Sequence, residues 1–460
     1  MSSSTPAPMQ SLQVPSRHTT EDRLLWDIVH EHLDEGAYLF TQWERALCSP
    51  LYTLPRLQRT VEARLLAHVD GLVVGGAPVR DRLLLPRLAG GGEGETFVAA
   101  LALLSEGPLQ AQQQVVEALS AAQGATRREL IRALQLQLPE GLVDTLQALR
   151  THTRETARAG ALEVLAAHRR LELQEVRAGL EDASEEVQRV ALRALRSMGL
   201  AGLAQEQVGR YLLSNFPAQT ESGQQLQQAA LEVVLVLGQG ELLELAYAVG
   251  HGRYRFSLPW GEGFRLLGAR LGQRAVPMLE AVLAQKDQTA LHVAALQGLG
   301  LTGTLDAANL CLDAMQEPGL TRVAGEAFAL ITGADLNRER LRAKPAPTEH
   351  TEAGLEERFL AIPEEDLPLA QVDAVAQAWR EVRRRWDPRL RYLCGQAESP
   401  TMLAEVLRGG SLYRRRLVLR RVEWWTQGKF EVRADALSRV QQTQGEAVLK
   451  YVQQTPPGLL

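Results

Sequence analysis

The chain has 460 residues, of which 45% are hydrophobic and 23% are charged, and its formal net charge is −5. This balance is typical of a well-packed globular protein and excludes wholesale disorder. Aromatic residues make up only 5%, and Leu, Ala, Val, Glu, Gln and Arg dominate, which favours helices over β-sandwiches or barrels.

Cysteine usage and the N-terminus predict a compartment. Cys48, Cys311 and Cys394 are far apart and form no CxxC motif, which favours a reducing environment over a disulfide framework or a zinc ribbon. The first eighteen residues lack the basic start and apolar core of a signal peptide, and no apolar run reaches eighteen residues. We therefore expect a cytoplasmic protein that does not engage a membrane.

The first part of the chain predicts a helical cap. Residues 1–20 are rich in Ser, Pro and Gln and are expected to be a disordered lead-in. From Leu24 to Phe40, and again from Leu57 to Val69, apolar residues recur at intervals of three and four. A third apolar block ends in Gly90–Gly92, so residues 21–92 are predicted to cap the following array.

Residues 93–335 repeat one pattern, a helix-period apolar stripe that ends on a glycine. The clearest copies run from Asp182 to Gly199, from Asp287 to Gly300 and from Leu320 to Gly333, and Gly238 ends another. Gly199 and Gly238 are 39 residues apart and Gly300 and Gly333 are 33 apart, which suits a two-helix unit of the HEAT type. The sequence therefore predicts an all-α fold: a HEAT-like α-solenoid of stacked helical hairpins, with an N-terminal helical cap and a C-terminal helical module.

Composition also predicts two interruptions of the repeat pattern and a C-terminal module. The period breaks at residues 251–261, which indicates an inserted loop, and residues 336–368 are polar and proline-bearing, as in a linker. Residues 369–460 are predicted to form a basic helical module. Its expected helices are Val372–Arg385, Met402–Leu407, Leu412–Trp425 and Ala434–Val440.

Motifs that would indicate catalysis are not found. The sequence contains no GxSxG and no dinucleotide fingerprint, and the glycine run at 90–94 lacks the GK[ST] of a phosphate loop. His30 and His32 are two residues apart, so on a helix they point about 200° apart and suit a solvated charged face. His68 is expected to cap a helix end. We therefore expect no catalytic residues, no cofactor and no metal, and hence no enzyme.

The strongest polar signal lies between Trp379 and Arg433, where fourteen basic and six acidic residues give +8 and leave −13 for the rest. Arginines interleaved with aromatic residues can bind phosphates and stack bases. The competing interpretation is that the tryptophans are core and the arginines pair with acidic residues of neighbouring repeats; only four of the fifty basic residues are lysines, so arginine clusters are partly compositional. The candidate partner-binding residues are Arg380, Arg383, Arg384, Arg385, Arg391, Tyr392, Arg414, Arg415, Arg416, Arg420 and Arg421.

Four stretches carry a family resemblance. They are residues 32–40 (HLDEGAYLF), 64–72 (RLLAHVDGL), 325–333 (GEAFALITG) and 386–395 (WDPRLRYLCG). In this order they resemble a bacterial family of HEAT-repeat proteins of uncharacterised function whose genes often lie among type VI secretion genes. The resemblance implies an accessory or adaptor that handles a secreted effector or a spike component, and it carries over no catalytic residue.

Three functional hypotheses remain open. The first is a non-enzymatic scaffold or adaptor whose concave face or basic C-terminal module binds another protein. The second is a HEAT-like protein that binds nucleic acid through the basic module. The third is a HEAT-like tetrapyrrole lyase, because the short repeats also resemble those of bilin lyases.

Overall fold

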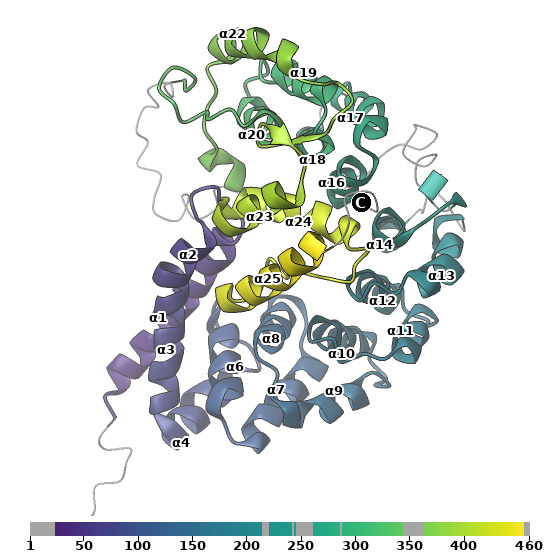
Figure 1. Ribbon diagram of the computed structural model, residues 1–460. Coiled ribbons are helices and arrows are strands. Elements are labelled where there is room, and N and C mark those ends of the chain that lie inside the picture. Colours follow the sequence, from purple (N-terminus) through teal and green to yellow (C-terminus); the bar gives the residue numbers. More distant parts are fainter. Residues whose placement is uncertain are drawn as a thin grey trace, which may run out of the picture.

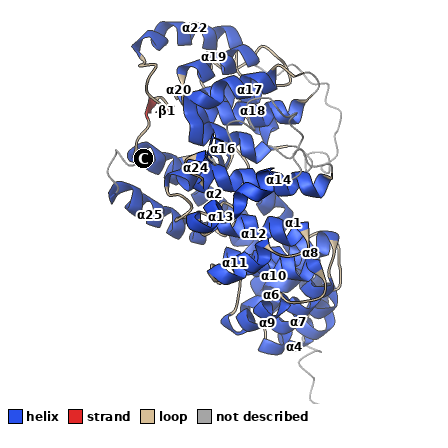
Figure 2. Cartoon of the chain, turned by 90° about the vertical axis from the view of Figure 1, so that its right-hand side faces the viewer, coloured by secondary structure: helices blue, strands red, loops and turns tan. Residues whose placement is uncertain are grey.

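The computed structural model describes residues 24–213, 220–241, 243–244, 261–285, 288–343 and 362–454. Across these ranges the chain is helical almost throughout (Figure 2), and the strands found there are one short hairpin, β1 (Tyr392–Leu393) and β2 (Gln396–Ala397). The predicted all-α fold is confirmed. The predicted lead-in at 1–20, nearly all of the insertion at 251–261 and the middle of the linker lie outside the described residues.

The helices follow one another along an arc (Figure 1). In chain order they are α1 (Trp26–Ala46), α2 (Leu54–Leu57), η2 (Gln58–Glu62), α3 (Ala63–Val74), α4 (Gly76–Val79), η3 (Arg80–Leu84), α5 (Leu85–Arg87), α6 (Glu95–Glu106), α7 (Leu109–Ala121), α8 (Gly124–Leu136), η4 (Glu140–Leu142), α9 (Val143–Leu149), α10 (Glu155–Ala167), α11 (Leu173–Leu180), α12 (Glu185–Ser197), α13 (Ala201–Leu213), α14 (Glu221–Leu237), α16 (Gly261–Leu271), η6 (Gly272–Ala275), α17 (Val276–Leu283), α18 (Thr289–Thr302), α19 (Leu305–Ala314), α20 (Thr321–Thr332), η7 (Pro363–Asp366), α22 (Val372–Val382), η8 (Arg383–Arg385), α23 (Pro400–Gly409), α24 (Leu412–Trp425) and α25 (Ser438–Gln454).

Two layers of helices make the solenoid. The even-numbered helices from α6 to α20 pack side by side as an inner layer, and α7, α9, α11, α13, α17 and α19 pack against them from outside. The repeated stripe explains the inner layer. On α12, Val187, Val190, Ala191, Ala194 and Leu195 are all buried, and the small alanines let neighbouring helices approach while the larger side chains fill the space between them.

Glycines end several inner helices, as predicted, but not all the predicted ones do. Gly199, Gly303 and Gly333 have φ of +67°, +69° and +70°, the left-handed conformation that favours glycine after a helix. The expectation for Gly300 is wrong. It lies inside α18, where a Cβ would come within 3.1 Å of the Cα of Ala327, so it permits close packing of α18 on α20, and Gly303 ends the helix instead.

The N-terminal helices form one core with the first repeat. Phe40 of α1 stacks on Phe97 of α6 with 3.7 Å between ring centroids, and Trp43 is fully buried. The Trp43 indole N–H donates to the carboxylate of Glu62 at 3.1 Å, which satisfies that polar atom inside the core.

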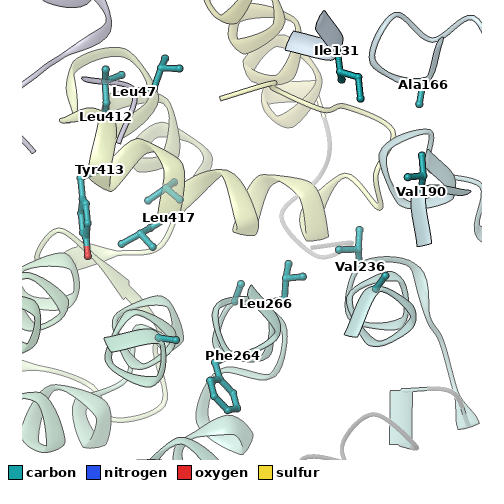
Figure 3. Close-up of a cluster of buried hydrophobic side chains, with 14 of the residues drawn as sticks. Leu47, Ile131, Ala166, Val190, Val236, Phe264, Leu266, Leu412, Tyr413 and Leu417 are labelled. Carbon is teal, nitrogen blue, oxygen red and sulfur yellow. The ribbon is translucent and has the colours of Figure 1, made fainter. Parts of the chain in front are cut away.

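The inner layer is covered by the chain's own C-terminus. The helices α23, α24 and α25 lie within the arc (yellow in Figure 1), and α24 packs on α14, α16 and α18. Figure 3 shows Leu412, Tyr413 and Leu417 of α24 in the same buried cluster as Leu266 of α16 and Val236 of α14. The concave face over these helices is therefore filled, and it is not the open partner-binding surface that the scaffold hypothesis expected there.

The C-terminal segment (residues 391–454) also joins the end of the array to the N-terminal cap. Thr53 and Ser411 form an antiparallel β-bridge, and the Leu412 N–H donates to the Tyr52 carbonyl at 2.7 Å. At the start of α25, the backbone N–H and the hydroxyl of Ser438 donate to Glu62. The predicted helix Ala434–Val440 is wrong at both ends, because α25 runs from Ser438 to Gln454. The Gln441 amide donates to the carbonyls of Ala434 and Ala436, which holds these residues in a turn before α25.

Candidate functional site

The structure divides the predicted partner-binding residues into an internal set and an exposed set. The internal set contains Arg391, Tyr392, Arg414, Arg415, Arg420 and Arg421, and the exposed set contains Arg380, Arg383, Arg384, Arg385 and Arg416. The two sets are adjacent in sequence but have different environments. Burial decides which of these arginines can reach a partner.

Arg391 and Arg421 cap the ends of inner helices. The Arg391 guanidinium donates to the carbonyls of Ala269 at 2.8 Å, Leu301 at 3.0 Å and Thr302 at 2.9 Å, and Arg421, which is fully buried, donates to Leu301 at 3.0 Å. These carbonyls belong to the last turns of α16 and α18, where no intrahelical donor is available. A cation at a helix C-terminus also complements the helix dipole.

Tyr392 and its neighbours continue this capping along the array. The Tyr392 N–H donates to the Gly303 carbonyl at 2.7 Å, and the Cys394 N–H donates to Leu330 at 2.7 Å. Tyr392 is itself buried, and its ring lies 4.2 Å from that of Trp386, centroid to centroid. The hairpin is thus a cap on α18 and α20.

Arg414 and Arg415 have internal partners. Arg414 forms a two-pronged ion pair with Glu326 of α20 at 2.5 and 3.0 Å, and Arg415 donates to the Leu407 carbonyl at 3.0 Å and to Gln441. Burial of Glu326 and Arg415 takes both out of water, so each depends on its partner for compensation. These arginines tie α24 to α20, α23 and α25.

Arg420 lies in a buried ionic cluster between α24 and the inner layer. Its partners are Glu423 at 2.8 Å and Glu262 of α16, and Arg196 of α12 pairs with Glu423 at 2.9 Å and with Glu232 of α14 at 2.7 Å. Burial raises the pKa of Glu262, but the charges of Arg420, Arg265 and Arg196 outweigh it and lower that pKa to about 2. The cluster therefore stays ionised at neutral pH and links α12, α14, α16 and α24.

The tryptophans of the basic stretch are also structural. Trp379 is 3% exposed, donates its indole N–H to Asn309 at 2.9 Å and packs edge-on against Phe328 and Trp386. No base could stack on a ring enclosed in this way. For the internal residues, the interpretation in which arginines pair with neighbouring repeats and tryptophans are core is the one the structure supports.

Four residues of the exposed set form an arginine ridge at the end of α22. Arg380, Arg383, Arg384 and Arg385 are exposed, and Arg389 beyond them is exposed and pairs with Asp387 at 3.2 Å. Arg416, on α24, is exposed and donates to the sulfur of Cys48. Of the predicted site residues, Arg416 and the four arginines of the ridge remain accessible to a partner.

Two hollows border the inner layer at its N-terminal half. One, of about 420 Å³, lies under the C-terminal segment and is lined by Cys48, Arg196, Glu423, Glu431 and Arg433 among others. Arg433 donates to the carbonyls of Gln135 at 2.9 Å and Ala167 at 3.5 Å, the ends of α8 and α10. The other, of about 800 Å³, is more open and runs over α8, α10 and α12. The sequence analysis did not find it, although two arginines on it, Arg189 and Arg193, stand one turn apart on the polar face of the clearest repeat.

Two histidines meet across the N-terminal cap. The Nδ1 atoms of His32 and His68 are 3.1 Å apart, so one ring donates and the other accepts a hydrogen bond. Burial, and then the proximity of His32, lower the pKa of His68 below its ordinary value. His68 therefore packs against α1, contrary to the helix-end cap expected for it. Within the described ranges no group of three or more His, Cys, Asp or Glu residues is arranged to hold a metal ion.

Two of the three thiols, those of Cys311 and Cys394, are poorly placed for nucleophilic chemistry. Burial raises the pKa of both Cys311 and Cys394, so both stay protonated at neutral pH.

Among the described helices, none combines the length and the hydropathy that a membrane span requires.

Comparisons with known proteins give little further information. No protein-family model matches the chain, and no curated protein matches it. The solved structure of human deoxyhypusine hydroxylase in complex with glycerol aligns with 66% of this chain and 98% of its own, at 16% identity and a TM-score of 0.26. Because that TM-score is low, the likeness supports no statement about the activity of this chain.

Proposed function

We propose that this protein is a non-enzymatic scaffold that binds another protein on the surface of a closed helical array. The observation that carries the proposal is the closure itself. Ion pairs and carbonyl caps from α24 and its flanking loops connect the inner helices α8 to α20 with each other and with the N-terminal cap. A surface fixed in this way loses little conformational freedom on binding, which favours affinity.

The resemblance to the type VI-associated family suggests which protein is held. By that resemblance, the partner would be a secreted effector or a spike component, with this chain as its accessory. The solenoid architecture suits such a role because stacked repeats present an extended surface that one compact partner can cover.

Affinity capture from the native cell tests the proposal. The tagged full chain is used as bait at about 50 mM and about 500 mM salt, and bound protein and bound nucleic acid are both identified. The proposal expects a discrete protein that stays bound at high salt. Recovery of nucleic acid alone, lost at high salt, would contradict it.

One observation favours nucleic-acid binding as a second candidate. The arginine ridge of Arg380, Arg383, Arg384 and Arg385 is exposed over two turns, and positive charge of this kind attracts phosphates. Single-stranded and duplex oligonucleotides titrated into the protein, and into the variant Arg383→Ser/Arg384→Ser/Arg385→Ser, test this. Binding that falls with salt and is lost in the variant would support it, whereas equal binding by both proteins would remove it.

A further inference from the structure

The open hollow over α8, α10 and α12 is lined by five arginines, of which two form ion pairs. It is bordered by α1 and by residues 91–93, and its volume is about 800 Å³. We call it the arginine groove and define it by Arg128 of α8, Glu163 of α10, and Arg189 and Arg193 of α12. It lies on the part of the inner layer that precedes the helices covered by α24.

Several charged residues along the groove have internal partners. Arg127 pairs with Glu186 at 3.1 Å, and Arg132 pairs with Glu44 at 2.6 Å and Asp435 at 3.1 Å. These side chains stabilise the array and are not available to a ligand.

Two carboxylates of the groove also accept hydrogen bonds from the protein itself. Glu129 accepts hydrogen bonds from the N–H groups of Gly94 at 3.0 Å and Phe97 at 3.1 Å, which caps the start of α6. Glu163 accepts a hydrogen bond from Gln135 at 3.3 Å. Neither carboxylate forms an ion pair with a groove arginine.

Three arginines remain without a carboxylate partner. Within the described part of the chain, Arg128, Arg189 and Arg193 form no ion pair and no side-chain hydrogen bond. Arg128 and Arg193 are exposed, whereas Arg189 is half-buried. Burial, and next the charge of Arg193, lower the pKa of Arg189, and the charges of Glu186 and Glu163 oppose this only in part. The Arg189 cation is therefore held where water is scarce and a like charge is near. An anion placed between Arg189 and Arg193 would relieve both effects.

The spacing of these arginines favours a particular anion. Residues four apart on a helix have Cβ atoms about 5–6 Å apart. Alternate side chains on one face of an extended segment are about 6.6 Å apart, since a strand rises about 3.3 Å per residue. Two carboxylates at positions i and i+2 of an extended chain can therefore meet Arg189 and Arg193, and guanidinium groups bind carboxylates in a two-pronged geometry.

The groove is less suited to nucleic acid. Phe40 is the aromatic residue in its lining, and that ring is 9% exposed and stacked on Phe97, so it offers no face to a base. Glu93 and Glu163 also line the groove and would repel a continuous phosphate backbone. An acidic peptide needs no aromatic platform, and its backbone N–H groups can donate to these carboxylates, whereas a phosphodiester backbone has no donor to offer them.

We propose that the arginine groove binds an extended acidic segment of the partner protein, with acidic residues at i and i+2. This inference rests on the proposed scaffold function and names the chemistry that the scaffold recognises. Arg189 and Arg193 hold successive carboxylates, and Arg128, on α8 beyond the intervening helix α10, meets a carboxylate farther along the same segment.

A peptide titration tests the groove directly. The full chain is titrated at about 50 mM salt against a fluorescein-labelled octapeptide of alternating Glu and Ala, and binding is read by anisotropy. The variant Arg128→Glu/Arg193→Glu changes two exposed side chains, so its fold is expected to persist, and a thermal melt checks this. The matched control Arg340→Glu/Arg439→Glu changes the net charge equally at two exposed positions outside the groove.

The proposal expects at least tenfold weaker peptide binding by the groove variant and unchanged binding by the control. Equal weakening in both variants, equal affinity in all three proteins, or no peptide binding to the unmodified chain would overturn it. A labelled twelve-nucleotide oligothymidylate is titrated in the same way, as a test for nucleic-acid binding. If it binds the unmodified chain but not the groove variant, and the peptide binds neither, the groove is a nucleic-acid site and the proposal is wrong.

Capture from cells separates this inference from the scaffold proposal. If the groove variant loses the protein that the unmodified chain retains, both stand. If the variant still captures that protein, the scaffold proposal stands and the groove assignment fails. If neither captures any protein, the scaffold proposal fails, and the inference that rests on it fails too.

Discussion

Glu423, near the end of α24, forms a 2.9 Å ion pair with Arg196, near the end of α12. Both side chains are buried, at 7% and 14% exposure, and 227 residues of sequence separate them. The pair joins the C-terminal segment to the middle of the repeat array. Removing one partner of such a pair leaves the other charge uncompensated, which is more costly than the net stability of the intact pair.

We therefore expect Glu423→Gln to lower the free energy of unfolding by about 3 kcal/mol, measured by urea denaturation. Glu446→Gln is the matched control, because Glu446 pairs with Arg408 by two bonds of 3.0 Å on the surface. Water and salt screen that pair, so its loss is expected to leave the denaturation midpoint unchanged. Equal midpoints for the two variants would show that the buried cluster does not hold the array closed.

Arg391 provides a second test, of carbonyl capping. Replacing it by Ala strips donors from the buried last turns of α16 and α18, and we expect a loss of about 3 kcal/mol in unfolding free energy. Arg389→Ala, two residues away, removes an arginine whose side chain is 87% exposed and is expected to have little effect. Thermal melts of both variants measure the difference. An Arg391→Ala protein as stable as Arg389→Ala would refute the capping role.

The sequence predicts the repeat array well because its signal is local. The stripe from Val187 to Leu195 repeats at helical spacing, and burial of that stripe is what an inner helix requires. The helix Leu412–Trp425 was predicted with the bounds that the structure has. Within one helix, periodicity contains enough information to fix the element.

The closure of the array could not be predicted in the same way. Arg421 reaches the Leu301 carbonyl from 120 positions away, and Arg414 reaches Glu326 from 88. Counting charges within residues 379–433 finds an excess of arginines but not their acidic partners on α14, α16 and α20. The excess therefore resembled a partner-binding patch, although most of it neutralises and caps the repeats.

Glu431 predicts a pH dependence of stability. Burial, and then the charge of Glu423, raise the pKa of Glu431 from its ordinary 4.5 to about 7, with Arg196 and Arg433 opposing and Asp435 adding to the rise. Because the folded state holds this proton more tightly than the unfolded state, stability falls as pH rises from about 4.5 to 7. Above pH 7 the full cost of ionising Glu431 is present.

Glu431→Gln removes that cost. We expect the variant to be more stable than the unmodified chain by about 2 kcal/mol at pH 8, with the difference shrinking toward pH 5. Urea denaturation of both proteins at the two pH values measures it, and the comparison cancels the titration of other groups. A difference that is the same at pH 5 and pH 8 would mean that Glu431 ionises normally in the folded protein.

A reversible cross-link between the C-terminal segment and the N-terminal cap tests whether the closed array is the form that binds a partner. Thr53 and Ser411 face each other in a β-bridge, and such pairs have Cα atoms about 4.5–5.5 Å apart, within the range a disulfide spans. Thr53→Cys/Ser411→Cys is expected to oxidise to a locked form, and Thr53→Cys alone controls for Cys48 and Cys394. We predict that the locked protein captures the same partner from cell extract as the reduced protein. Capture by the reduced form only would contradict partner binding by the closed array. It would mean that the C-terminal segment must leave the array before a partner can bind.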